Sequence, residues 1–267
     1  MTGQTSPPSA LQPLPHSPEQ GRTWLETIGV LGLVIAILAA ATGVGSLAAG
    51  VVDWHVAIDT PQARPAGALE TFAALRLAVF LAAFQLATLA LTSIAARLFR
   101  GGRVTFLALS APGGALAASF TFSAFLIAGA AVYAGAVLSF DRNALLGDVR
   151  LLADMLRTDV WWMIALAAVV GAPIAEEVLF RGLMYGVLRT SPLGKVAAAA
   201  ITAIVWASVH AQYSLYGIFG IALIGLYLAW VREKTGGLLA PIICHAAYNA
   251  SVLTVMMLVP ERLTQMG

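Results

Sequence analysis

Long apolar runs are the feature that most limits what this chain can fold into. A membrane-spanning helix needs roughly 20 apolar residues to cross the hydrocarbon of a bilayer, and such runs follow one another along most of the sequence. Hydrophobic residues make up 60% of the 267 residues and charged residues only 10%, whereas soluble domains carry roughly 25%. The sequence therefore predicts an all-α fold, a polytopic transmembrane helix bundle with the lipid bilayer as its main solvent.

About seven spans are expected on this rule, together with one amphipathic helix on the membrane surface. In residues 141–158, leucine and methionine recur at helical spacing among aspartate and arginine, which is typical of a helix lying in the membrane interface. The expected spans cover residues 27–51, 73–96, 114–138, 160–180, 193–210, 213–231 and 238–259.

The start of the chain has a different composition. Residues 1–22 contain five prolines among Ser, Gln and Thr, so they bury too little apolar area to fold and predict a flexible tail. The apolar run that follows is too long for a signal peptide, and we expect it to be a signal-anchor span.

Charges between the spans predict the orientation in the membrane. Arginine and lysine follow the second, fourth and sixth expected spans, whereas acidic residues dominate after the first and third. By the positive-inside rule, the N-terminus and the even-numbered exits are cytoplasmic. The 15 basic residues form no stripe, so no nucleic-acid partner is expected. The lone Cys244 excludes an intramolecular disulfide and a cysteine-based metal site.

Ionisable residues inside apolar spans are energetically expensive and indicate functional sites. Near the end of the fourth span, Glu176 and Glu177 are adjacent and Arg181 follows. Neighbouring residues on a helix point about 100° apart, whereas side chains four residues apart meet. We therefore predict that Glu177 pairs with Arg181 and that Glu176 faces a cavity. Pro173 lacks a backbone donor and predicts a kink or an opened helical turn.

Two histidines lie in the remaining spans at helical spacing to a possible partner. Trp206 precedes His210 by four residues, and His245 precedes Asn249 by four, so each pair shares a helix face. Taken singly, the glutamates fit a charge cluster at a span end, His210 fits an interfacial residue, and His245 with Asn249 fits hydrogen bonding between helices. Their concentration in the C-terminal part of the chain favours a common site instead.

These motifs carry a resemblance to a known family. The series E-E-x-x-x-R at 176–181, aromatic-x-x-x-His at 206–210 and H-x-x-x-N at 245–249, with the stretch REKTGGLLAPIICH, resembles the CPBP family. These are the CAAX-protease and bacteriocin-processing intramembrane proteases, also called the Abi family, which include Rce1-like prenyl endopeptidases. The resemblance covers about 160–259. Trp206 departs from the family, which usually has Phe there.

The resemblance implies an intramembrane endopeptidase that acts on membrane-associated peptides or proteins, including lipidated ones. It implies Glu176, His210, His245 and Asn249 as the catalytic set, with Glu177 and Arg181 completing the first motif. In this interpretation Glu176 activates water, His210 shares it, and His245 and Asn249 stabilise the oxyanion. The chain then divides into the tail 1–22, the N-terminal spans and amphipathic helix 23–158, and a CPBP/Abi-type catalytic core 159–260.

A zinc-dependent form of the same reaction is the alternative mechanism. Glu176, His210 and His245 would then be the metal ligands, with water at the fourth position. The H-E-x-x-H helix that places two ligands and a base together is missing. Although the family has long carried the label metalloprotease, we favour a metal-free mechanism without a cofactor.

Two other classes of function fit an intramembrane polar cluster. One is a transporter or channel that relays protons, and the other is a non-catalytic membrane factor such as an immunity protein. The first is disfavoured because no internal repeat is evident and spans one to three supply no carboxylate. The second does not need Asn249 four residues after His245. A bacterial plasma membrane is the expected location, and the sequence selects no particular substrate.

Overall fold

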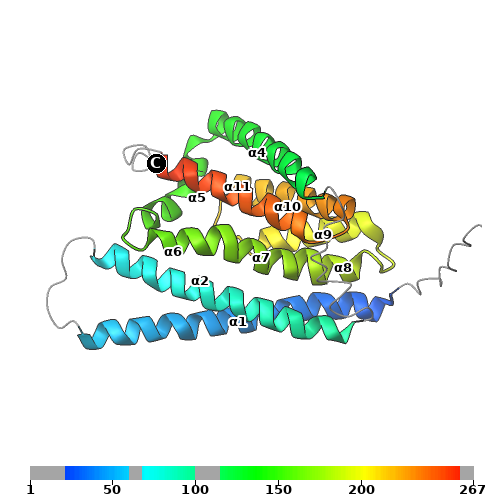
Figure 1. The fold of residues 1–267 in the computed structure, drawn as a ribbon, viewed down its shortest axis with the longest axis horizontal. Helices are drawn as coiled ribbons and strands as arrows, with labels where there is room; N and C mark the ends of the chain where they lie inside the picture. The colour runs from blue at the N-terminus through cyan, green and yellow to red at the C-terminus, as the bar shows by residue number, and fades with distance from the viewer. Residues whose placement is uncertain (1–21, 60–67, 100–114, 259–267) are drawn as a thin grey trace, which may run out of the picture.

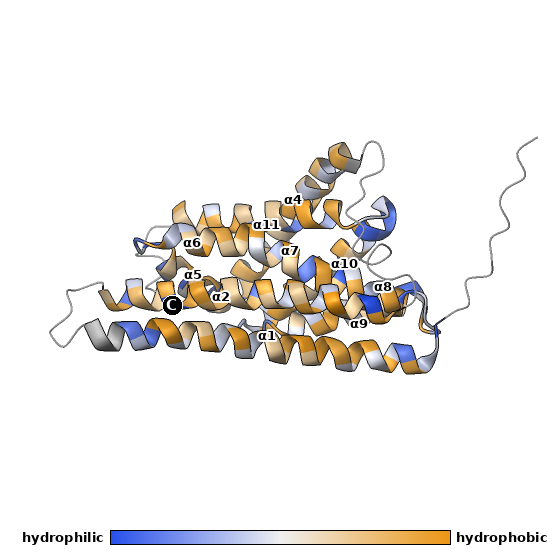
Figure 2. Cartoon of the chain, turned by 60° about the horizontal axis from the view of Figure 1, so that its bottom comes forward, coloured by the Kyte–Doolittle hydropathy of each residue, from blue (hydrophilic) through white to orange (hydrophobic). Residues whose placement is uncertain are grey.

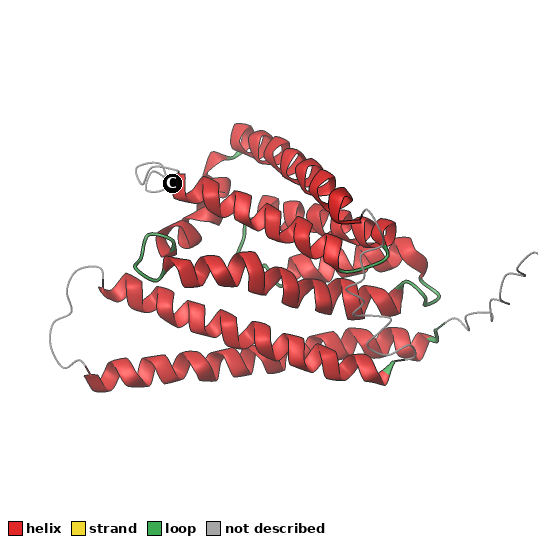
Figure 3. Ribbon diagram, viewed as in Figure 1, coloured by secondary structure: helices red, strands yellow, loops and turns green. Residues whose placement is uncertain are grey.

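In a computed structural model, the protein is a bundle of helices throughout the part of the chain that is described, residues 22–59, 68–99 and 115–258 (Figure 3). The main helices are α1 (Trp24–Asp59), α2 (Ala68–Ala95), α4 (Ala115–Phe140), α5 (Arg142–Met155), α9 (Gly194–Ser208), α10 (Leu215–Thr235) and α11 (Leu239–Leu258). A further long helix is built from consecutive segments: α6 (Trp161–Leu166), the π-helical η2 (Ala167–Gly171), α7 (Ala172–Glu176), the π-helical η3 (Glu177–Met184) and α8 (Tyr185–Leu188). A short 3₁₀ turn, η1 (Ala96–Leu98), ends α2.

Six helices in the described residues are long and apolar enough to cross a membrane, and the protein is a multi-pass membrane protein. They cover Trp24–His55, Ala68–Leu98, Leu116–Phe140, Trp161–Leu188, Leu215–Thr235 and Leu239–Leu258. The expected fifth span is present as α9, but its 15 residues give a length of only about 22 Å. The expected fourth span does not end near residue 180. It continues to Leu188, because Glu177 and Arg181 are buried together rather than marking a polar helix end.

The helices run roughly alongside one another, as Figure 1 shows. α1 packs along α2, α9 packs against α10, and α4 crosses α11. The start of α1, the end of α2, the α8–α9 connection and the α10–α11 connection lie at one end of the bundle (Figure 1). Arg97, Arg189, Lys195 and Lys234, which follow the even-numbered spans, lie at this end. Figure 2 shows apolar residues along the helices and hydrophilic residues towards their ends.

The outer surface of the bundle is apolar, as lipid requires. Large side chains such as Leu25, Phe120, Val132 and Val196 are each more than half exposed, although they lie within helices. Exposure of this kind is unfavourable in water but not in hydrocarbon, where a helix only has to satisfy its backbone groups. The buried core is centred instead on η3 and α8, where every residue from Glu177 to Leu188 is buried.

α5 confirms the predicted amphipathic helix. It covers Arg142–Met155, and the Asp141 carboxylate caps it by accepting a hydrogen bond from the Ala144 backbone N–H at 3.0 Å. Ala153 is buried against other helices, whereas Arg150 is exposed. α5 contacts α2, α4, α10 and α11, so its apolar face packs onto the bundle.

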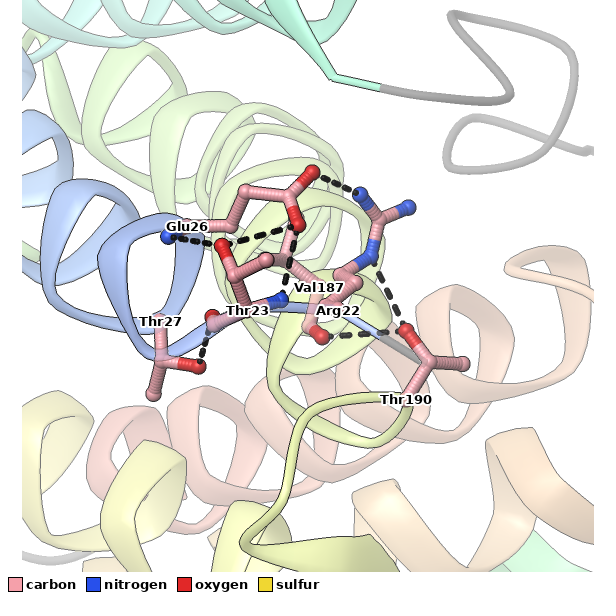
Figure 4. Close-up of polar contacts among 6 residues, drawn as sticks. All are labelled: Arg22, Thr23, Glu26, Thr27, Val187 and Thr190. Carbon is pink, nitrogen blue, oxygen red and sulfur yellow. Dashed lines mark hydrogen bonds and ion pairs between the residues drawn. The ribbon is translucent and has the colours of Figure 1, made fainter. Parts of the chain in front are cut away.

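The first helix is anchored at its N-terminus by local and long-range contacts (Figure 4). Thr23 and Glu26 form a reciprocal capping box, because each side chain accepts a hydrogen bond from the backbone N–H of the other. Arg22 donates from its backbone to the Thr190 carbonyl at 3.0 Å and from Nε to Thr190 Oγ1 at 2.9 Å. The start of α1 is therefore fastened to the α8–α9 connection. The rest of the predicted tail, residues 1–21, lies outside the described residues.

Candidate active site

The two adjacent glutamates have different surroundings, as the helical geometry predicts. Glu177 is the first residue of η3 and is fully buried, and Glu176 is the last residue of α7 and is partly buried. Arg181 Nη1 donates to Glu177 Oε1 at 3.0 Å, and neither side chain has any exposed surface. The predicted ion pair is present, and Glu176 takes no part in it.

A second donor and an acceptor also contact this buried pair. His245 Nδ1 lies 3.0 Å from the same Glu177 Oε1, and Arg181 Nη2 donates to the Gly225 carbonyl on α10 at 3.2 Å. The ion pair therefore joins three helical segments: η3, α10 and α11. Buried charges tolerate such a position only when they are paired and hydrogen-bonded, so this group has a strict geometry.

Trp206 of α9 lies at the centre of the predicted site residues. Its indole Nε1 donates to Glu176 Oε2 at 2.6 Å. The ring makes edge contacts with both imidazoles, at centroid distances of 5.5 Å to His210 and 5.4 Å to His245. The Arg181 guanidinium carbon lies 4.3 Å from its ring centre. Glu176, His210 and His245 are thus brought together around one aromatic side chain.

The hydrogen bonds of the two histidines define their tautomers. His210 Nδ1 lies 2.9 Å from the Trp206 carbonyl oxygen, which can only accept, so Nδ1 carries the proton. His245 Nδ1 faces the Glu177 carboxylate in the same manner. In the neutral form, each ring therefore keeps an unprotonated Nε2, which is available as a proton acceptor.

The observed lengths of two helices explain why His210 lies near the other site residues. With straight spans of the predicted lengths, His210 would lie too far from them. The long helix runs to Leu188, so Glu176 lies near its middle rather than at its end. α9 ends at Ser208, and His210 follows directly in the connection to α10. Because α9 is short, His210 lies at the same depth in the bundle as Glu176.

Asn249 contacts the long helix at a different level. Its Nδ2 donates to the Ala168 carbonyl at 2.7 Å, eight residues before Glu176 in the sequence. That carbonyl lacks its usual helical partners, because the Ala172 N–H bonds to Ala167 and Pro173 has no N–H. The opened turn predicted at Pro173 is thus observed as η2, and Asn249 satisfies the carbonyl that it exposes.

Three residues outside the predicted set support this site. Gln85 of α2 is buried and donates to the Ala167 carbonyl at 3.0 Å. Asp148 of α5 accepts hydrogen bonds from Ser214, in the connection that carries His210. Tyr213 lies 6.1 Å from His210 between ring centres, and burial, reinforced by the nearby Asp148 and Glu176 carboxylates, raises the pKa of its phenol. Of these three residues, only Gln85 could have been noticed in the sequence, as a single polar residue within an apolar span.

The donor set for the zinc alternative lies around Trp206 but is not arranged as a metal site. Within the described ranges, no group of three or more His, Cys, Asp or Glu side chains is arranged so that it could hold a metal ion. Glu176 binds the Trp206 indole, whereas His245 binds Glu177. Within the described residues, the three proposed zinc ligands are thus not grouped as a metal site.

The fold and these contacts define a multi-pass membrane protein with buried acid–base groups. Residues 158–251 match the family model described as type II CAAX prenyl endopeptidase Rce1-like, which confirms the CPBP resemblance of this segment. The family described in this way is one of CAAX-type prenyl endopeptidases.

The chain is also similar to an uncharacterized 24.3 kDa protein of Escherichia coli. The two are 35% identical over 125 residues, which are 43% of this chain and 55% of that protein. The chain thus spans about half the length of this relative. No solved structure gives a significant match.

Proposed function

We propose that this protein is an intramembrane endopeptidase that hydrolyses peptide bonds of membrane-associated peptides or proteins, lipidated ones among them. The observation that carries the proposal is the convergence of Glu176, His210 and His245 around Trp206. The match of residues 158–251 to the Rce1-like endopeptidases supports the same class of substrate. A carboxylate and two imidazoles with free Nε2 atoms supply the acid–base groups that peptide hydrolysis needs.

In the proposed mechanism, Glu176 is the general base. Its Oε2 is held by the Trp206 indole, so Oε1 takes a proton from the attacking water. His210 orients that water through Nε2, because its Nδ1–H is committed to the Trp206 carbonyl. The hydroxide adds to the substrate carbonyl, and the protonated Glu176 then gives its proton to the leaving amine as the C–N bond breaks.

The oxyanion of the tetrahedral intermediate requires hydrogen-bond donors. Asn249 offers the second hydrogen of its amide, since the first is bound to the Ala168 carbonyl. His245 donates from Nε2 only as an imidazolium, because its Nδ1–H faces Glu177. In that state Glu177 is its counter-ion, which gives the buried Glu177–Arg181 pair a role in holding His245 as well as in folding.

The substitution Glu176→Gln tests the base. It keeps the shape of the side chain and an oxygen for the Trp206 hydrogen bond, but removes the proton acceptor. Cleavage of a library of membrane-anchored peptides should fall by roughly 10²–10⁴-fold, the usual contribution of a general base. Glu70→Gln, on an exposed carboxylate in the first turn of α2, is the matched control. Full activity of Glu176→Gln excludes the proposed base.

Metal dependence is tested separately on purified protein. We propose that no metal takes part, so activity should persist after treatment with EDTA, and elemental analysis should find less than stoichiometric zinc. Stoichiometric zinc whose removal stops turnover, and whose return restores it, would establish the zinc mechanism instead.

The proposed orientation places the N-terminal end of the bundle in the cytoplasm of a bacterial cell. The basic residues Arg97, Arg189, Lys195 and Lys234 lie at this end, in agreement with the positive-inside rule. Cysteines introduced as Thr23→Cys and Phe140→Cys lie at opposite ends of the bundle. A membrane-impermeant maleimide should label only the second in intact spheroplasts, and labelling of Thr23→Cys alone would reverse the topology.

A further inference from the structure

The connection between α9 and α10 carries His210 and is held from outside the catalytic motifs. It comprises residues 209–214 and contains local turns, in which the Tyr213 N–H donates to the His210 carbonyl at 3.0 Å. His210 itself follows the last turn of α9, with its N–H bound to the Ala207 carbonyl at 3.0 Å. Such a connection is the least constrained part of a helical bundle, so the position of His210 depends on what fastens it.

Asp148 of α5 holds this connection in place through two hydrogen bonds. One carboxylate oxygen accepts the Ser214 backbone N–H at 2.5 Å, and the other accepts the Ser214 hydroxyl at 2.7 Å. Both oxygens of one aspartate are thus bound to one residue, four positions after His210. Charge-assisted hydrogen bonds of this kind are shorter and stronger than neutral ones, and a two-point contact also fixes orientation.

The same contact continues into α10. Ser214 Oγ accepts the Gly217 N–H at 3.1 Å and caps the helix. A β-carbon at Gly217 would collide with Asp148 Oδ2 and would press on Tyr213. A glycine at this position is what allows the carboxylate to lie against the helix start. Three features therefore accommodate the Asp148 carboxylate: the hydrogen bonds from Ser214, the cap that Ser214 forms on α10, and the absence of a side chain at Gly217.

Asp148 lies outside the part of the chain that resembles the proteases. The matched segment begins at residue 158, whereas Asp148 is in the middle of α5, the amphipathic helix. α5 also packs against α2 and α11, which gives the carboxylate a firm base.

We propose that Asp148 is a positioning residue that holds the 209–214 connection, and through it His210, at the active site. This inference rests on the proposed function, in which His210 orients the attacking water. Asp148 does not touch the reacting atoms. It acts through Ser214, and it makes α5 a structural part of the site.

The reactivity of the histidines tests this placement without any substrate. Diethyl pyrocarbonate modifies neutral imidazoles, and peptide mass spectrometry reports the rate at each histidine of the purified protein. In Asp148→Asn, one oxygen and with it one acceptor is lost, so the connection should open more often and His210 should react about threefold faster or more. His245, which is 4% exposed and belongs to α11, is the internal reference and should not change.

Two matched variants separate positioning from general effects. Asp154→Asn makes the same change of charge on the same helix, at an exposed residue paired with Arg157. Asp141→Ala removes the cap of α5 without touching Ser214. Neither should alter the rate at His210. Ser214→Ala removes the hydroxyl bond to Asp148 together with the cap on Gly217 and should raise the rate. The Asp148→Asn change should add less in this background because the two residues act as one unit.

The outcomes distinguish the proposal from its alternatives. An unchanged rate at His210 in Asp148→Asn overturns it, and so does an equal rise at His245, which indicates general loosening. With a cleavable peptide, kcat should fall about tenfold while KM stays within about twofold, because water orientation rather than substrate binding is impaired. If the wild-type protein cleaves no peptide, the proposed function fails, but the reactivity result still decides whether Asp148 holds His210.

Discussion

Trp206 of α9 donates its indole N–H to Glu176 of α7 across 2.6 Å. The same ring lies against His210, His245 and the Arg181 guanidinium. Trp206 therefore does more than share a helix face with His210, because it also contacts residues of the other helices. It organises the groups proposed to carry out hydrolysis.

Trp206→Phe isolates the indole hydrogen bond. Phenylalanine keeps an aromatic ring, and it is the residue usual in the family that the chain resembles, but it has no N–H. A hydrogen bond to a carboxylate contributes about 1.5–3 kcal/mol, so a less firmly held Glu176 should lower the initial rate of peptide cleavage roughly tenfold.

The control for this change is Trp162→Phe, on a tryptophan that is 54% exposed at the start of α6. Its rate should match the wild type. Wild-type rates in Trp206→Phe would mean that the indole N–H has no part in placing Glu176.

Arg181→Met tests the buried ion pair by removing one partner. Glu177 would keep its contact with His245 but lose its main counter-ion in a site with no exposed surface. Breaking a buried pair in this way costs about 3–5 kcal/mol, which should appear as a lower midpoint in thermal unfolding in detergent micelles.

Arg76→Met is the matched comparison, because Arg76 and Asp53 also lie 3.0 Å apart but are 53% and 45% exposed. Exposed pairs contribute about 0–1 kcal/mol, so its midpoint should hardly move. Equal losses in the two variants would contradict the importance given to burial.

The motifs predicted the pairing of Glu177 with Arg181 because helical spacing alone decides which side chains of one helix meet. They also predicted an opened turn at Pro173, since the missing N–H is a property of the residue itself. The convergence of Glu176 and His210 was harder to foresee. It depends on the lengths of two helices, and hydropathy ended the fourth span eight residues early, because it cannot tell buried polar residues from a polar helix end.

The supporting residues could not be predicted for a different reason. Gln85 and Asp148 reach the site from helices 82 and 66 residues away from their partners in sequence. No local spacing rule links such distant positions. The sequence predicted that Trp206 shares a helix face with His210. It could not predict that the indole N–H donates to Glu176, because that bond depends on α7 lying beside α9. These contacts belong to the tertiary arrangement.

Gly171→Ala should be poorly tolerated although alanine favours helices. A β-carbon at Gly171 would collide with the Gln85 side chain, which is bound to the Ala167 carbonyl. Overpacking of this kind costs about 1–3 kcal/mol, measured as a fall in the unfolding midpoint. Gly29→Ala, where nothing lies within 4 Å of the added carbon, should be neutral or slightly stabilising.

The double variant Gln85→Ala with Gly171→Ala separates collision from backbone effects. Removing the glutamine side chain frees the space, so Gly171→Ala should cost less in that background than alone. Equal costs in both backgrounds would show that the glycine is needed for its backbone rather than for the approach of Gln85.

Asn249→Ala removes the only side-chain donor assigned to the Ala168 carbonyl within the described chain. A fully buried carbonyl without a partner costs about 1–3 kcal/mol. This contact is partly buried, so the unfolding midpoint should fall by part of that amount. Thr254→Ala, which removes a hydroxyl bond to a carbonyl of its own exposed helix turn, should have little effect.

Pro173→Ala tests whether the proline is the reason that the Ala168 carbonyl needs Asn249. Alanine restores an N–H five residues after Ala168, the spacing of a π-helical hydrogen bond, so the carbonyl gains a second possible donor. Asn249→Ala should therefore cost less in the Pro173→Ala background than in the wild type, a coupling between residues of two helices that a double-mutant cycle measures. Additive costs would show that the proline does not create the need for Asn249. Non-additive costs would explain why a proline in α7 and an asparagine in α11 occur in the same chain: one opens the turn, and the other satisfies it.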